Sequence, residues 1–148
     1  MSDTTTAPAA ADAATQAALE RLNTVIDRLI APDGCPWDST QTPESLTEYV
    51  IEECHELVDA IRSGKTADMV EELGDVAFLI LMIGKLMARA GGPSLADALE
   101  VEAAKMVRRH PHVFSDTTYE NQSEQLKDWD RIKREEKAAA DAEGPKDL

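Results

Sequence analysis

Two short motifs place carboxylates three residues apart within apolar helical patterns. Residues 53–56 carry Glu53 and Glu56, and residues 72–75 carry Glu72 and Asp75. Residues three apart are neighbours on one face of a helix, so each motif presents two carboxylates together. Two such faces brought together would supply four hard oxygen ligands, a set that suits Mg²⁺ or Mn²⁺. The spacing therefore predicts a divalent-metal site built from these four acids.

The first acid pair falls on an apolar helical stripe, and the second precedes an apolar segment. At about 100° per residue, Glu53 lies between Tyr49 and Leu46, while Glu56 lies at the edge of the stripe. Residues 76–83 are apolar on every side, which predicts a central helix, and Glu72 and Asp75 precede this apolar segment by one turn. A buried carboxylate without a partner is costly or becomes protonated, and a divalent cation would remove that cost.

The alternative is that these acids are solvated or paired with Lys and Arg on a helical surface. An isolated acid pair at this spacing is usually of that kind. Because two pairs here encroach on apolar faces, we favour the metal site.

The elements that must position these acids are expected to be helices, because no segment gives a convincing strand pattern. Thr42 is the predicted N-cap of the second helix, with Pro43 at its first position, and Gly64 ends it. Ser94 is the predicted N-cap of the fourth helix, with Asp97 three residues on. A loop with His112, Val113 and Phe114 follows that helix. The five helices are predicted over residues 15–30, 43–63, 67–89, 95–110 and 123–137, an all-α bundle.

A single domain is expected over residues 15–138. Its length suffices for one hydrophobic core. Residues 1–14 are rich in Ala and Thr and lack a signal-peptide pattern, so they are expected to form a disordered tail. Residues 139–148 are expected to form a second disordered tail.

The charge of the chain limits its partners. The formal net charge is −14, which argues against general binding to nucleic acid or to an anionic membrane. A small phosphorylated ligand remains compatible, because bound metal ions reverse the local field. No stretch is long enough to cross a bilayer. Cys35 and Cys54 are too few for a disulfide scaffold, so we expect a reducing cytoplasm.

Cationic side chains on the later helices suggest a phosphorylated substrate. Lys105 and Arg109 lie four residues apart on the fourth helix, and Trp129 and Lys133 share that spacing on the last. Cations beside a metal site would neutralise a triphosphate. In the alternative interpretation, Lys105 and Arg109 bind the carbonyls at the C-terminal end of their helix or pair with Glu102. Trp129 would then pack in the hydrophobic core rather than contact a ligand.

Two histidines follow the fourth helix. His110 and His112 could transfer protons. Because they flank Pro111 at the helix end, we expect them to cap or pack the turn. Trp37 is expected to lie in a packed loop that borders the substrate pocket of a neighbouring subunit.

Six short motifs follow one another along residues 22–137. They are Gly34-Cys35-Pro36-Trp37-Asp38, Gln41-Thr42, Glu52-Glu53 with Glu56, Glu71-Glu72-Leu73-Gly74-Asp75, Arg108-Arg109-His110-Pro111-His112-Val113-Phe114, and Trp129 with Ile132-Lys133. Each motif alone is weak, but the six in this order are specific. By these motifs the chain resembles the MazG nucleoside triphosphate pyrophosphohydrolases of the all-α NTP pyrophosphatase superfamily.

The resemblance implies Mg²⁺-dependent hydrolysis of NTPs and dNTPs to a monophosphate and pyrophosphate, for cleansing or regulating nucleotide pools. It implies homodimers, sometimes paired into tetramers, and the apolar third helix agrees with an obligate interface. By motif, the catalytic metal ligands would be Glu53, Glu56, Glu72 and Asp75, with Glu52 and Glu71 as auxiliary acids. Lys105, Arg109 and Lys133 would contact the phosphates, and Trp129 the nucleoside.

The chain departs from the family pattern at one position. Relatives often carry a basic residue one turn before the second acid pair, where this chain has Met69 and its nearest basic residue is Lys65. This departure puts one phosphate contact in question. Two rival functions stay open: a narrow dUTP or dCTP pyrophosphatase, and a non-catalytic helical interaction module.

Overall fold

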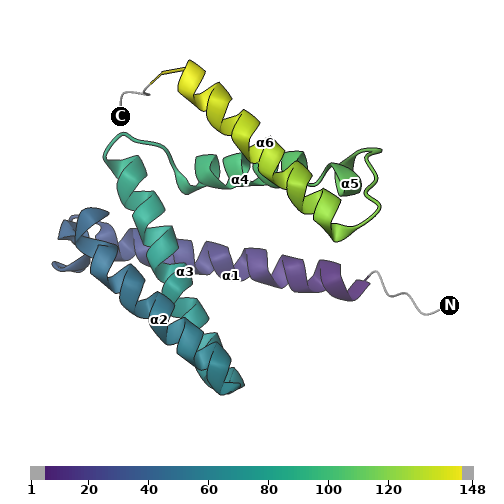
Figure 1. Ribbon diagram of the computed structural model, residues 1–148. Helices are drawn as coiled ribbons and strands as arrows, with labels where there is room; N and C mark the ends of the chain where they lie inside the picture. Colours follow the sequence, from purple (N-terminus) through teal and green to yellow (C-terminus); the bar gives the residue numbers. More distant parts are fainter. Residues whose placement is uncertain (1–5, 145–148) are drawn as a thin grey trace. The chain divides into compact units, whose positions relative to one another are not determined.

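The structure is all-α, as the sequence predicts. This computed structural model describes residues 6–144, with side chains described from residue 9 onward, and those residues contain no strand. The chain divides after Pro93 into two compact units, each described here by itself. The helices are α1 (Thr6–Ile30), α2 (Thr47–Ser63), α3 (Thr66–Arg89), α4 (Leu95–Arg109), α5 (Pro111–Phe114) and α6 (Gln122–Ala142), with 3₁₀ turns at Asp38–Thr40 and Glu44–Leu46 (Figure 1).

The first unit contains α1, α2 and α3, and α2 packs along α3 as a helical hairpin (Figure 1). Its three fully buried large side chains are Ile26 of α1, Leu46 of the 3₁₀ turn before α2, and Met82 of α3. Burying such side chains is the main favourable term in folding. The core thus ties together the helices that carry the two acid motifs.

A tight turn sets the hairpin. Gly64 adopts the left-handed conformation, with φ of 70°, and its N–H donates to the carbonyl of Ile61. Side chains other than Gly rarely adopt that conformation at a helix end. The predicted end of the second helix at Gly64 is therefore confirmed, and α3 begins two residues later at Thr66.

The start of the second helix is also close to the prediction. Thr42 Oγ1 accepts from the Ser45 N–H at 3.2 Å, and Ser45 Oγ accepts from the Thr42 N–H at 2.9 Å. Thr42 therefore caps this segment, but the first turn is 3₁₀ and the α-helix begins at Thr47. A tighter first turn is common at helix N-termini.

Three further features differ from the expected ones. Helix α1 begins at Thr6 rather than near residue 15, and α6 continues to Ala142 rather than 137. Both extensions are rich in Ala, the strongest helix former, which sustains a helix even where residues 9–21 bury no side chain. The expected loop at His112 contains one helical turn, α5, which Pro111 starts at its first position. The rest of the two expected tails, residues 1–5 and 145–148, lies outside the described residues.

The third helix is not buried on all sides, contrary to the prediction. Leu79, Leu81, Met82 and Leu86 are buried, but Ile80 is 49% exposed. In α4, the apolar Leu99 is also 60% exposed. An apolar pattern marks a surface that favours burial, and it does not specify whether the same chain or another one covers it.

The second unit contains α4, α5 and α6. The predicted cap of α4 is confirmed: Ser94 and Asp97 form a reciprocal capping box. Ile132 of α6 is buried, and α4 packs against α6. None of the described helices combines the length and apolarity needed to cross a membrane.

The loop after α1 depends on Gly34. A Cβ at that position would lie 2.3 Å from the carbonyl oxygen of Arg28 and 2.5 Å from that of Leu29. Both atoms are backbone and cannot move aside cheaply, so we expect Gly34→Ala to destabilise the protein by about 1–3 kcal/mol, as overpacking does. Urea denaturation monitored by circular dichroism measures this. Gly74→Ala is the control, because an added Cβ there meets nothing within 4 Å. Equal stability of the two variants would contradict the prediction.

Candidate functional site

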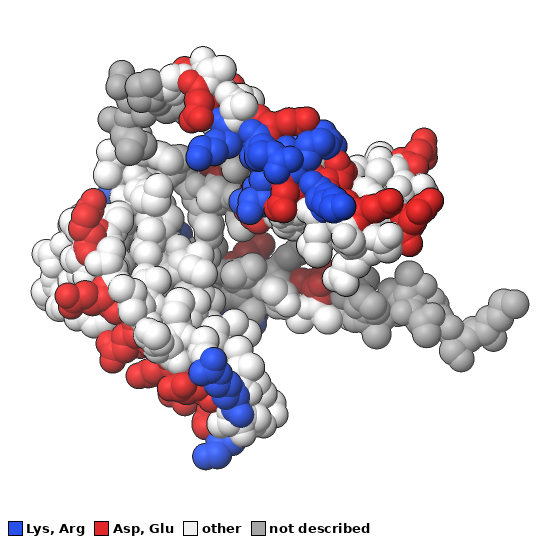
Figure 2. Space-filling model, viewed as in Figure 1, with Lys and Arg blue, Asp and Glu red and all other residues white. Residues whose placement is uncertain are grey.

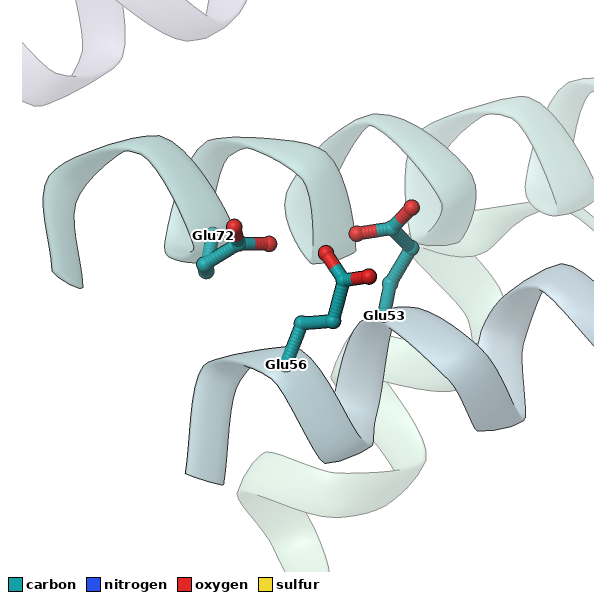
Figure 3. A group of neighbouring side chains, drawn as sticks. All are labelled: Glu53, Glu56 and Glu72. Carbon is teal, nitrogen blue, oxygen red and sulfur yellow. The ribbon is translucent and has the colours of Figure 1, made fainter. Parts of the chain in front are cut away.

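Three of the four predicted acids meet between α2 and α3. Glu53 and Glu56 project from α2 and Glu72 from α3, and the three side chains point toward one another (Figure 3). One carboxylate oxygen from each lies within 4.8 Å of the others. The hairpin turn at Gly64 produces this arrangement, because it aligns the two motifs on facing sides of the helix pair.

No cation within the described residues neutralises this cluster. None of the ion pairs formed there includes Glu53, Glu56 or Glu72. Glu53 Oε2 and Glu72 Oε2 are buried and have no hydrogen-bond partner among residues 6–144. This observation disfavours the alternative in which the acids pair with Lys or Arg on the surface.

The clustering shifts the titration of the acids. Burial, and next the negative charge of Glu56, raises the pKa of Glu72 to about 7. Burial, followed by the charges of Glu56 and Asp75, also raises the pKa of Glu53. A raised pKa means that each carboxylate favours its protonated form more than usual, unless a cation lies nearby. Three convergent carboxylates with two unpartnered oxygens fit a hard divalent cation such as Mg²⁺ or Mn²⁺.

The fourth predicted ligand, Asp75, does not belong to that group of oxygens. It is exposed, one turn along α3 from Glu72, and its charge contributes to the raised pKa of both Glu53 and Glu72. The auxiliary acids Glu52 and Glu71 are exposed, and Met69 is half-buried before Glu72. The roles of these residues stay predictions.

A cavity of about 240 Å³ adjoins the cluster within the first unit. Glu53 and Asp75 contribute to its wall, together with the apolar side chains of Leu46, Phe78 and Met82. Trp37 and Tyr49 also line it and meet edge to face, with ring centroids 5.7 Å apart. Trp37 was expected to border a neighbouring subunit's pocket. The structure places it beside Glu53 and Asp75 of its own chain, and the contact with a neighbouring subunit stays a prediction.

A second hollow, of about 300 Å³, opens on the other side of the cluster. Glu56 and Glu72 line it together with Asp59 and Asp68, neither of which was predicted for the site. On the helical wheel, Asp59 points away from the apolar stripe that carries Glu53. The sequence spacing could have indicated both residues. Asp59 lies three residues after Glu56 and Asp68 lies four residues before Glu72, and both spacings put the two acids on one helix face.

The predicted phosphate contacts lie in the second unit, and two of them are already paired. Lys105 Nζ lies 2.5 Å from Glu102, as the alternative interpretation expected. Arg109 pairs with Glu136 at 2.9 Å, a partner that was not predicted. Lys133 is exposed and makes no ion pair within the part of the chain described. Figure 2 shows basic side chains gathered over α4 and α6, whereas acidic side chains follow α2.

Trp129 and the two histidines form an aromatic group beside Arg109. The Arg109 guanidinium lies 5.7 Å from the Trp129 ring centroid, and His110 meets the same ring edge to face at 5.0 Å. His110 Nδ1 lies 2.6 Å from the Met106 carbonyl oxygen, so this histidine packs and caps the helix end as expected. His112 Nε2 lies 3.3 Å from Gln125 Nε2, and its Nδ1 is buried without a partner.

Comparison with known proteins gives consistent matches. Residues 41–114 match the model of the MazG nucleotide pyrophosphohydrolase domain. The nucleoside triphosphate pyrophosphohydrolase of Escherichia coli (strain K12) is 40% identical over 121 residues, which cover 81% of this chain and 46% of that protein. The nucleoside triphosphate pyrophosphohydrolase/pyrophosphatase MazG of Thermotoga maritima is 39% identical over 118 residues, covering 80% of this chain and 45% of that one.

A solved structure agrees with these sequence matches. The crystal structure of a mazG-related protein from Thermotoga maritima superposes with a TM-score of 0.65 and 29% identity, over 78% of this chain and 98% of that one. The matched segment spans less than half the length of the two curated relatives.

Proposed function

This chain belongs to the MazG nucleotide pyrophosphohydrolase domain family, and on that premise we propose that it hydrolyses NTPs and dNTPs to a monophosphate and pyrophosphate. The observation that carries the proposal is the cluster of Glu53, Glu56 and Glu72, with two buried oxygens that lack partners. Such a cluster needs a divalent cation, and a triphosphate is a substrate that binds one. The physiological role that follows is cleansing or regulation of nucleotide pools.

In the proposed mechanism, Glu53, Glu56, Glu72 and Asp75 would hold Mg²⁺, for which Mn²⁺ could substitute, and the exposed Glu52 and Glu71 would support them. When bound, the metal supplies charge neutralisation of the phosphates and a water of lowered pKa. One of the four acids orients the attacking water. The oxygen of that water bonds to the α-phosphorus while the water gives a proton to the acid that orients it. The bond from the α-phosphorus to the bridging oxygen breaks, and pyrophosphate leaves.

The cations of the second unit complete the proposal. Lys105, Arg109 and Lys133 would neutralise the charge that develops on the leaving pyrophosphate, and Trp129 would contact the nucleoside. Lys105 holds Glu102 in the structure and would exchange that partner for a phosphate. Lys133 makes no ion pair within the described residues and is available directly. Lys65, at the N-cap of α3, is the nearest basic residue to the position that Met69 occupies.

We also propose that residues 15–138 work as one domain within a homodimer or homotetramer. Exposed apolar side chains support this proposal: Leu19 and Val25 on α1, and Val70 and Leu73 on α3. An apolar groove of about 530 Å³, lined by Val50, Ile51 and Ile83 among others, adds to that surface. Light scattering measures the assembly. The two unpaired cysteines agree with the proposed cytoplasmic location.

Product identity tests the proposed reaction. The purified protein is incubated with Mg²⁺ and a panel of NTPs, dNTPs and oxidised or deaminated analogues, and the products are separated by ion-exchange chromatography. We expect monophosphate and pyrophosphate. Turnover of dUTP or dCTP alone would establish the narrow-specificity alternative. Diphosphate and phosphate would refute the proposal, and no turnover with Mg²⁺ or Mn²⁺ would support the non-catalytic interaction module.

A further inference from the structure

One glutamate of α6 holds both arginines at the end of α4. Glu136 Oε1 accepts from Arg108 Nε at 2.7 Å, and Glu136 Oε2 accepts from Arg109 Nε at 3.3 Å and from Nη2 at 2.9 Å. The side chains of Glu136 and Arg109 are only 19% and 17% exposed. Ion pairs shielded in this way are screened less by salt than surface pairs. The pair is therefore a fixed feature of the second unit.

Arg109 keeps unused hydrogen-bond donors. A guanidinium carries five N–H groups, and only Nε and Nη2 donate to Glu136. Nη1 has no hydrogen-bond partner among the described residues. The guanidinium also lies near the Trp129 ring, 5.7 Å from its centroid. A carboxylate at one edge and an aromatic ring beside the group restrict its orientation, and the Nη1 edge stays available.

The charge of this cluster stays positive. Arg108 and Arg109 share the single carboxylate of Glu136, so these three side chains together carry one net positive charge. Lys133 adds another on α6, one turn before Glu136. A planar donor edge with excess positive charge suits a phosphate oxygen, because charge-assisted bonds to a guanidinium are short and directional.

We propose that Glu136 is a positioning residue for phosphate binding: it holds the Arg109 guanidinium beside Trp129 with the Nη1 edge free for a phosphate group of the nucleotide. This inference rests on the proposed function for the identity of the ligand. A guanidinium fixed in advance loses less rotamer freedom when the ligand binds. Without Glu136, Arg109 would sample many orientations and bind the phosphates more weakly.

A double-mutant cycle tests this role in the full-length protein. We expect Glu136→Ala to raise the KM for Mg·ATP on the order of tenfold, with a smaller change in kcat, because ground-state phosphate binding is lost. Glu136→Gln should recover part of the loss, since its amide oxygen still accepts from Arg109. In an Arg109→Ala background, adding Glu136→Ala should have no further effect, because the two residues act as one unit.

Glu135→Ala is the matched control. It removes the same charge one residue away, but Glu135 is exposed, and within the described part of the chain it pairs only with Arg131. Its KM should stay within about twofold of the wild type, as for most surface substitutions. Equal KM values for the Glu135 and Glu136 variants, or additive effects of the Glu136 and Arg109 substitutions, would overturn the proposal. If Glu136→Ala lowers the melting temperature enough to compromise folding, Glu136→Gln replaces it. The KM of that variant is then compared with the KM of Glu135→Ala, and its additivity with Arg109→Ala is measured.

Binding of inorganic tripolyphosphate separates this inference from the proposed reaction. If the wild type turns over no nucleotide, the proposed function fails, and calorimetry with tripolyphosphate then decides the role of Glu136. Tripolyphosphate binding that Glu136→Ala weakens only when Arg109 is present would uphold the positioning role. Undetectable binding, or binding that is equal in the Glu136→Ala variant and the wild type, would overturn it.

Discussion

Replacing Glu53 with glutamine is expected to lower hydrolysis by at least about a hundredfold, the range seen when a preorganised polar group is removed from an active site. Glutamine keeps the size of the side chain but cannot carry the negative charge that binds a divalent cation. The same change removes a carboxylate whose pKa is raised by burial and by Glu56. The metal-free variant should therefore melt at a higher temperature than the metal-free wild type.

These two effects have opposite signs, and together they identify a metal ligand. A residue that only supports the fold would lose activity and stability together. The measurements are steady-state rates at saturating Mg²⁺ and melting temperatures in EDTA and in Mg²⁺. Glu48→Gln is the matched control, because Glu48 is exposed one turn earlier on the same helix. Full activity of the Glu53→Gln variant would exclude the metal site as described.

Magnesium binding is expected to weaken as the pH falls below about 7. Burial and the charge of Glu56 raise the pKa of Glu72 to about 7, so protons compete with the cation for this carboxylate near neutral pH. Binding should release protons at pH 7, and calorimetry in two buffers of different ionisation enthalpy measures that release. No proton release at this pH would contradict the raised pKa of Glu72.

The stability of the metal-free protein should depend on pH for the same reason. The pKa of Glu72 rises from 4.5 to about 7 on folding, so the folded state favours the protonated form. This contribution to stability is fully present below pH 4.5 and is lost as the pH rises through about 7. In EDTA, the loss of this contribution should lower the melting temperature as the pH rises from 4.5 to about 7. We expect added Mg²⁺ to reverse this decrease and the Glu72→Gln substitution to remove it. The same dependence in the Glu72→Gln variant and the wild type would contradict the assignment.

Local sequence signals were sufficient for most helix ends. The capping box of Ser94 and Asp97, the reciprocal bonds of Thr42 and Ser45, and the left-handed Gly64 each involve residues within a few positions of one another. Interactions of this range can be predicted from side-chain chemistry alone. The early start of α1 was not predicted, because low sequence complexity suggested disorder where Ala favours a helix.

The partners of the basic residues were predicted less well. The pairing of Lys105 with Glu102 spans three residues and was foreseen as an alternative. The pairing of Arg109 with Glu136 spans two helices, and nothing in the spacing of α4 indicates it. Likewise, exposure of Ile80 and Leu99 could not be deduced from their apolar character.

By itself, the sequence determined the helical class, the hairpin turn and the acid pairs on their helix faces, because these depend on interactions between residues close in the chain. Only the tertiary structure decided which acids converge, since the register of α2 against α3 brings Glu53, Glu56 and Glu72 together and leaves Asp75 outside the group. It also decided that Glu136 engages Arg109. Contacts between helices depend on packing of the whole unit, and a spacing rule within one helix does not contain that information.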